Sequence, residues 1–306
     1  MGAGREKYSR YAELILVLLI FIWGINIPVM KIGLTALTPT VYNTFRLLIA
    51  AFISVAALLL TKTYKPMPMR DLKLIGSVSI LGFFFNQVLI TFGITQTTAG
   101  NASLVLAILP VAVALINRVL NMEHISRRVT VAIVVSLIGV VLIVLGSNKE
   151  VSLAGPHMIG AALILAGQCC YGYYTVFFKR LTDTYSIYQI IACVMSICAL
   201  LFCLISLPDL ISLQLAEIPA AAWYSIVFSG VFGLSWGNFV WVWVVGRLGS
   251  TRASVYPNLC PVIAIAFAWY YLDETFGVLQ MVGAAVIFWG VYLTHNQASS
   301  SPKPLD

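Results

Sequence analysis

The stretch WGINIPVMKIGLTALT (residues 23–38) is repeated in pattern by YGYYTVFFKRLTDTYS (residues 171–186), 148 positions later. The matched positions include Gly24 with Gly172, Lys31 with Lys179, and Thr38 with Ser186. Glycine, lysine and a hydroxyl residue keep one spacing across a segment that is otherwise mostly apolar. The sequence therefore indicates that a structural unit occurs twice in this chain.

Residues further along repeat after 151 positions instead. The matched sets are Gly82 with Gly233, Ala102-Ser103 with Ala253-Ser254, Pro110-Val111 with Pro261-Val262, Glu123 with Glu274, and Gly139-Val140 with Gly290-Val291. Chance readily matches valine to valine in an apolar chain, but it does not explain a proline and a glutamate in one register. A loop insertion accounts for the three-residue difference between the registers. Duplication in a membrane protein favours a transporter built around the interface of its repeats.

The composition predicts an all-α membrane protein. Hydrophobic residues make up 60% of the 306 residues and charged residues only 9%, whereas about a quarter of a soluble domain is charged. Most apolar runs approach the ~20 residues that a helix needs to cross a bilayer, where backbone amides must be paired within the segment. The ten expected spans are 14–34, 41–61, 74–94, 99–117, 129–146, 158–178, 187–207, 222–245, 253–272 and 276–293.

The basic residues predict the orientation of these spans. With the N-terminus in the cytoplasm, the outer side holds only Lys31 and Lys149, and Arg46 lies inside a span. All other lysines and arginines fall on the cytoplasmic side, as the positive-inside rule requires. The net charge of +7 therefore follows from topology and implies no nucleic-acid partner. Because each repeat has five spans, the second must enter from the opposite face, which predicts inverted repeats with both termini cytoplasmic.

The expected organisation has two repeats with short flanks. The parts are a cytoplasmic flank (1–13), a first repeat (14–146), a linker loop (147–157), a second repeat (158–293) and a disordered cytoplasmic tail (294–306). The first apolar run is too long for a signal-peptide core, so we expect it to stay in the membrane. The six cysteines lack the spacing of metal ligands, and we expect neither a metal site nor a cofactor.

Several of these residues carry a family resemblance. Trp23-Gly24-Ile25-Asn26 followed by Lys31, then Arg46-Leu47-Leu48, resembles the start of an EamA-type repeat, and the Pro, Glu and Gly-Val positions resemble its end. Over about residues 12 to 295 the chain resembles the ten-helix branch of the drug/metabolite transporter superfamily. The resemblance implies an inner-membrane secondary transporter, commonly an exporter of amino acids or related metabolites. Tyr171 and Val194 depart from the pattern at the positions of Trp23 and Arg46.

Polar side chains at membrane depth usually face a cavity or a neighbouring helix. Helical spacing places several of them on common faces, such as Gln168 with Tyr171, and the 151 register matches Gln87 with Asn238. Carboxamides beside aromatic walls suit a small polar or zwitterionic solute, although hydrogen bonding between helices is the alternative for each residue. The candidate substrate-binding residues are Trp23, Asn26, Asn86, Gln87, Gln168, Tyr171, Trp236, Asn238, Tyr256 and Asn258.

Prolines and the few charges suggest mechanical roles. Pro110 and Pro261 lie within expected spans and are candidate hinge points, with a static packing role, the more frequent one for a membrane proline, as the alternative. Glu123 and Glu274 lie at span edges, where we expect each to cap the N-terminus of the next helix. Arg46 either snorkels to the outer surface or meets a carboxylate in the transport pathway.

These features predict a secondary transporter of a small organic metabolite, with an amino-acid exporter favoured. A nucleotide-sugar or drug carrier of the same superfamily is the alternative, and a membrane enzyme or scaffold is the alternative from another class. Gly233-Leu234-Ser235-Trp236-Gly237 spells the G-x-S-x-G motif of hydrolases, but it lies inside an apolar span without a nearby histidine. No acidic residue falls in the middle third of a span, so we expect facilitated diffusion or exchange without a central proton-carrying carboxylate.

Overall fold

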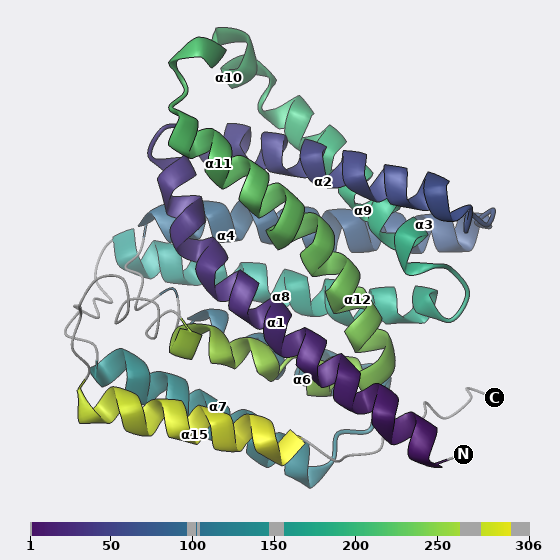
Figure 1. The fold of residues 1–306 in the computed structure, drawn as a ribbon, viewed down its shortest axis with the longest axis vertical. Helices are drawn as coiled ribbons and strands as arrows, with labels where there is room; N and C mark the ends of the chain where they lie inside the picture. Colours follow the sequence, from purple (N-terminus) through teal and green to yellow (C-terminus); the bar gives the residue numbers. More distant parts are fainter. Residues whose placement is uncertain (1, 97–101, 103–104, 147–155, 264–276, 295–306) are drawn as a thin grey trace.

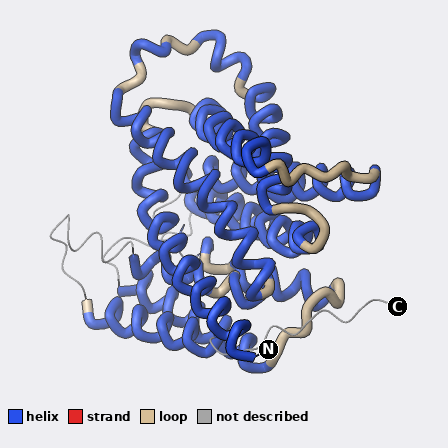
Figure 2. The backbone as a smooth tube through the Cα atoms, turned by 45° about the vertical axis from the view of Figure 1, so that its right-hand side comes forward, coloured by secondary structure: helices blue, strands red, loops and turns tan. Residues whose placement is uncertain are grey.

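The computed structural model describes residues 2–96, 102, 105–146, 156–263 and 277–294. These residues form helices joined by short connections, with no β-strand among them (Figure 2). The expected all-α fold is therefore confirmed. The residues outside this description include Glu274, Lys149, Lys303, the linker around residues 147–155 and the tail after residue 294. They also include residues 264–272 of the expected span 253–272 and several residues at the start of span 99–117.

Among the described residues, six helical stretches are long and apolar enough to cross a membrane. They are α1 (Gly2–Leu34), of which residues 11–34 qualify, α2 (Pro39–Thr61), the continuous run of α3 (Met69–Ser77), η1 (Val78–Phe84) and α4 (Phe85–Gln96), α8 (Pro156–Thr182), α9 (Ile187–Ile205), and the run of α11 (Ala220–Phe228), η3 (Ser229–Trp236) and α12 (Gly237–Leu248). Large apolar side chains such as Leu60, 83% exposed, cover their outer surfaces. Lipid is the solvent that stabilises such surfaces.

The remaining named helices complete the described bundle. They are α6 (Leu109–Val119), α7 (Arg127–Gly146), α10 (Leu207–Ser212), η2 (Leu215–Glu217), α13 (Ser250–Ala253), η4 (Tyr256–Leu259) and α15 (Val278–Thr294). The elements α7 and α15 correspond to the expected spans 129–146 and 276–293. The described residues thus agree in position with eight expected spans and leave spans 99–117 and 253–272 partly undescribed.

The helices pack in a pattern that links the two halves. α7 lies against α15 and α2 against α9, while α4 and η1 lie along α8, and α11, η3 and α12 lie along α1 (Figure 1). Each pair joins one helix of the first repeat to one of the second. Under the sequence registers the α8 contact with η1 corresponds to the α1 contact with η3. The main buried apolar core lies where these contacts meet.

The local backbone repeats with the registers found in the sequence. The π-helical segments η1 and η3 begin at Val78 and Ser229, which are 151 residues apart. The Thr38 hydroxyl accepts a hydrogen bond from the Val41 amide at the start of α2, and the Ser186 hydroxyl accepts one from the Gln189 amide at the start of α9. A hydroxyl at this position satisfies an amide that the first turn leaves unpaired. Equivalent residues therefore build equivalent helix starts.

Glycines allow the two halves to approach each other closely at the central crossings. A Cβ on Gly82 would lie 2.8 Å from the Tyr174 Cβ and 3.0 Å from its Cα, and a Cβ on Gly233 would lie 3.0 Å from the Asn26 Nδ2. Tyr174 and Asn26 are themselves 148 residues apart. The missing side chain at each glycine lets a helix of one half contact the π-helical segment of the other half.

The expected span 99–117 is interrupted beside Pro110. Pro110 lies in the first turn of α6, after a turn at Ala107 and Ile108. The expected span 253–272 is interrupted at the matching place by the 3-10 segment η4, directly before the helical residues Cys260 and Pro261. Pro110 therefore starts a helix and does not kink one from within, and its role as a hinge point stays a prediction. Proline suits a first helical turn because the amide it lacks has no partner there.

Candidate functional site

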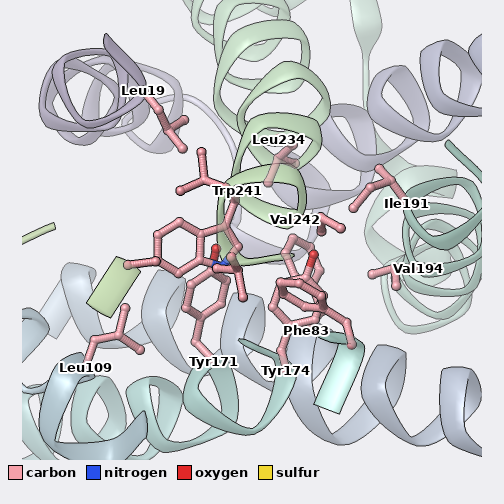
Figure 3. Close-up of a cluster of buried hydrophobic side chains, with 14 of the residues drawn as sticks. Leu19, Phe83, Leu109, Tyr171, Tyr174, Ile191, Val194, Leu234, Trp241 and Val242 are labelled. Carbon is pink, nitrogen blue, oxygen red and sulfur yellow. The ribbon is translucent and has the colours of Figure 1, made fainter. Parts of the chain in front are cut away.

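Aromatic side chains from both halves meet at the centre of the bundle. The Tyr171 ring of α8 lies 5.9 Å from the Trp241 ring, 6.3 Å from the Trp23 ring and 5.3 Å from the Tyr174 ring, centroid to centroid. Phe83 of η1 continues the group at 5.1 Å from Tyr174. Figure 3 shows Tyr171, Tyr174 and Phe83 below Trp241 of α12. We call these five residues the aromatic cluster.

The aromatic cluster also contains polar atoms, and three of them have specific hydrogen-bond partners. The Trp23 Nε1 donates to the Gly233 carbonyl oxygen at 3.1 Å, and the Trp241 Nε1 donates to the Thr175 Oγ1 at 3.2 Å. The Tyr174 hydroxyl donates to the Asn238 Oδ1 at 3.2 Å. Buried indole and phenol groups normally need such partners. The Trp23 bond crosses the boundary between the two halves, and the other two bonds fix rings within the second half.

Three other candidate carboxamides tie helices together. The Asn86 Nδ2 donates to the Gly167 carbonyl oxygen at 2.9 Å, and the Gln168 Nε2 donates to the Leu106 carbonyl oxygen at 2.8 Å. The Asn258 Nδ2 donates to the Ser136 Oγ of α7 at 2.8 Å. Asn86 also accepts a hydrogen bond from the Gln87 Nε2 at 3.1 Å. Such bonds stabilise helix packing in a membrane.

Asn26 and Arg46 have polar atoms that the surrounding protein does not satisfy. The Asn26 Oδ1 and the Arg46 Nε are buried without a hydrogen-bond partner in the described part of the chain. The Arg46 Nη1 donates to the Asn43 Oδ1 at 3.0 Å and contacts the Met30 Sδ at 3.6 Å. Arg46 is only 2% exposed. It therefore does not snorkel to the surface, which excludes one of the two expectations.

Glu123 is the centre of a polar network at the end of the bundle that carries the N-terminus. Its carboxylate pairs with Lys179 of α8 and accepts hydrogen bonds from the amides of Ser250 and Thr251 at 2.8 and 3.1 Å. The Thr251 hydroxyl and the Asn117 Nδ2 also donate to it. Burial would raise the pKa of the Glu123 carboxyl, but Lys179 and the two amides outweigh that effect and lower it below its ordinary value.

This network joins the two halves of the chain. The Glu123 carboxylate meets the start of α13, which follows Gly249 at a φ of 87°. It does not cap α7, the next helix along the chain. The expectation that Glu123 caps the following helix was therefore wrong about which helix it contacts. Glu13 of α1 pairs with Arg252 beside it. We call the end of the bundle formed by Glu13, Glu123, Lys179 and the α12–α13 junction the N-terminal face.

The structure brings together only part of the predicted set. Trp23, Tyr171 and Asn238 meet in or beside the aromatic cluster, and Asn26 contacts Gly233 next to it. Trp236 is half-buried against the same core and Tyr256 is buried near α15, while Asn258 faces α7. Sequence reasoning missed Phe83, Tyr174 and Trp241. Tyr174 has a detectable signal, since it lies three residues after Tyr171 on one helix face and matches Asn26 in register.

Comparisons with known proteins agree with this architecture. The model of the EamA-like transporter family matches residues 10–145 and again 158–295. A probable terminal-alkyne amino-acid exporter of Streptantibioticus cattleyicolor is 29% identical over 92% of this chain and 92% of its own length. A probable amino-acid metabolite efflux pump of Salmonella typhimurium is 27% identical over 93% of this chain and 95% of its own.

A solved crystal structure has the same fold. It superimposes with a TM-score of 0.77 and covers 94% of this chain and 99% of the other chain, at 16% sequence identity. The uncharacterized transporter YdfC of Bacillus subtilis is 26% identical over 94% of this chain and 91% of its own length. The two family matches fall on the two sequence repeats.

Proposed function

The chain belongs to the EamA-like transporter family, and on that premise we propose that it exports amino acids or related small metabolites across the cytoplasmic membrane. The relatives named as an amino-acid exporter and an amino-acid metabolite efflux pump support this substrate class. The aromatic cluster and the carboxamides beside it offer apolar walls with few polar groups, the composition of a small-molecule site.

The observation that carries the proposal is the matched crossing of α1 with η3 and of α8 with η1. The two crossings use residues in equivalent positions, Asn26 on Gly233 and Tyr174 on Gly82. They flank the aromatic cluster, so an exchange of their geometries would expose the cluster first to one face and then to the other. We infer ten spans in two inverted repeats, with alternating access by this exchange.

In this proposal the N-terminal face is cytoplasmic, because the basic residues gather there. The Glu123 network and the Glu13–Arg252 pair then close the cytoplasmic side in the conformation described. Opening requires the carboxylate of Glu123 to leave the amides of Ser250 and Thr251. Release of that contact would let α6 and α13 separate and admit solute from the cytoplasm.

A flux assay tests the proposal. Purified protein in sealed proteoliposomes should release preloaded, radiolabelled amino acids faster than protein-free vesicles do. Replacing Trp23 and Tyr171 together by alanine should abolish that release, whereas Leu60→Ala, at a lipid-facing position, should leave it unchanged. Equal release from protein-free and protein-containing vesicles across the common L-amino acids and small amines would refute the proposal.

A further inference from the structure

Arg46 is buried without a carboxylate partner among the described residues, unlike the partly buried Lys179 and the buried Arg252. Lys179 pairs with Glu123, and Arg252 pairs with Glu13. Arg46 is buried on α2, and in the described part of the chain its contacts are the neutral groups of Asn43, Met30 and Tyr42. The Tyr42 ring centroid lies 5.4 Å from the guanidinium carbon.

The bonding of Arg46 leaves one side of the guanidinium available. Both hydrogen bonds that the described residues give it come from Nη1, and its buried Nε has no partner. An arginine presents Nε and the other Nη as a planar fork that matches the two oxygens of a carboxylate. A buried charge without a counter-ion is costly in a membrane, and intramembrane ionisable residues are generally functional.

The second half of the chain shows that the fold itself does not need this charge. The position that matches Arg46 is Val194 of α9, which is fully buried. A valine therefore fills the equivalent place in the contact between α2 and α9. The positive charge of Arg46 therefore has a role that is specific to the first half of the chain and that the contact between α2 and α9 does not require.

The surroundings of Arg46 fit a zwitterion. Met30, which contacts the guanidinium, lies four residues after Asn26 on α1, so both occupy one helix face. The Asn26 Oδ1 is a buried acceptor without a donor, and it lies against Gly233 of η3. A guanidinium and an unpaired carbonyl oxygen on neighbouring helices would bind a carboxylate and an ammonium group respectively.

We propose that Arg46 binds the carboxylate of the transported solute and that Asn26 accepts a hydrogen bond from its amino group. The assignment rests on the proposed transport function and restricts it to solutes that carry a carboxylate, with α-amino acids as the fitting class. Decarboxylated amines and amino-acid amides lack the group that Arg46 binds. The solute would reach Arg46 when one face of the bundle opens, because the guanidinium is closed off in the conformation described.

The test uses matched solutes and matched variants in proteoliposomes. The common L-amino acids, putrescine and choline are first screened for efflux, and the fastest amino acid becomes the radiolabelled probe. Its efflux is then competed with an excess of the same amino acid or of its amide. Arg46→Gln and Arg46→Lys are compared with Ser54→Ala, which removes another buried, unpaired polar atom from the same helix.

The amide should compete at least about tenfold more weakly than the amino acid, since a charge-assisted bidentate pair is lost. Arg46→Gln should lower probe efflux about tenfold or more, Arg46→Lys should fall between it and the wild type, and Ser54→Ala should match the wild type. If Arg46→Gln does not fold, the wild-type competition and Arg46→Lys still decide the matter.

Two results would overturn the assignment while leaving transport intact. One is an amide that competes as well as its amino acid, and the other is wild-type efflux of putrescine or choline without efflux of any amino acid. Unchanged amino-acid efflux in folded Arg46→Gln would also overturn it. If the wild type releases no solute at all, the proposed transport function fails together with this assignment.

Discussion

The two crossings at the centre of the molecule share a backbone and differ in side chains. Where α8 crosses η1, Tyr174 lies on Gly82, and its ring joins the aromatic cluster. Where α1 crosses η3, the smaller Asn26 lies on Gly233 and keeps an unpaired oxygen. Duplication has preserved the close helix contact on both sides while the lining has diverged. We propose that the shared contact serves the fold and that the divergent side chains set the choice of solute.

The largest effect should come from breaking the contact between Glu123 and Lys179, which holds the N-terminal face closed. Glu123→Gln removes the partner of Lys179 in a largely buried network, which should lower the free energy of unfolding by about 3 kcal/mol. Thermal unfolding in detergent would measure the loss.

Lys179→Met removes the other partner of the ion pair and serves as the matched control variant. If the pair acts as a unit, the double variant Glu123→Gln/Lys179→Met should lose much less than the sum of the single variants. Additive losses would mean that the ion pair does not hold this face.

The two glycines should respond unequally to an added methyl group. In Gly82→Ala the new carbon would meet the Tyr174 backbone at 3.0 Å, which cannot move without shifting α8, whereas in Gly233→Ala it would meet the end of the Asn26 side chain at 3.0 Å. We expect Gly82→Ala to lose about 2 kcal/mol and Gly233→Ala less than about 1 kcal/mol. Unfolding midpoints of the two variants measure the difference, and an equal loss would contradict the distinction between them.

The carboxamides should divide into packing and transport residues. Asn86→Ala leaves the Gly167 carbonyl without its donor and should lower stability by about 1 kcal/mol, with little change in efflux per folded molecule. Asn26→Ala removes an oxygen that has no partner, so it should change stability less and efflux more. Paired unfolding and efflux measurements on both variants would check this, and a reversal of the two patterns would refute the division.

A smaller effect concerns pH. Because the folded-state pKa of Glu123 is lowered, its contribution to stability is complete above the ordinary carboxyl pKa and is lost as the pH falls through the lower folded-state value. The stability difference between wild type and Glu123→Gln should therefore shrink from about pH 5 towards pH 3. A difference that stays constant over this range would show that Glu123 does not act through its charge.

The sequence was sufficient for the helical fold, the two repeats and the transporter family, because apolar length and register are properties of single segments. It included Trp23, Tyr171 and Asn238 in one candidate set, and the structure places them in or beside the aromatic cluster. The sequence could not show whether Asn86, Gln168 and Asn258 line a cavity or bond to neighbouring helices. The answer depends on which helix packs against each residue's face. The burial of Arg46 depends in the same way on how α1 packs against α2.

The expectation for Glu123 was wrong because tertiary packing decides which helix its carboxylate meets. Glu123 was expected to cap the helix that follows it in the chain, but its carboxylate meets the start of α13 because the bundle brings the two halves together at the N-terminal face. Pro110 starts α6 because the preceding residues Ala107 and Ile108 leave the helix as a turn. The Glu123 contact joins the two halves, so it cannot be read from one repeat alone.

Alternating access is tested most directly by holding the N-terminal face closed. In a variant whose six native cysteines are replaced, cysteines at positions 123 and 179 can be joined by a short bifunctional thiol reagent that a reductant cleaves. The account predicts that the cross-linked protein loses amino-acid efflux and recovers it after reduction, while each single-cysteine variant is unaffected by the reagent. Efflux at an unchanged rate through the cross-linked protein would contradict the account.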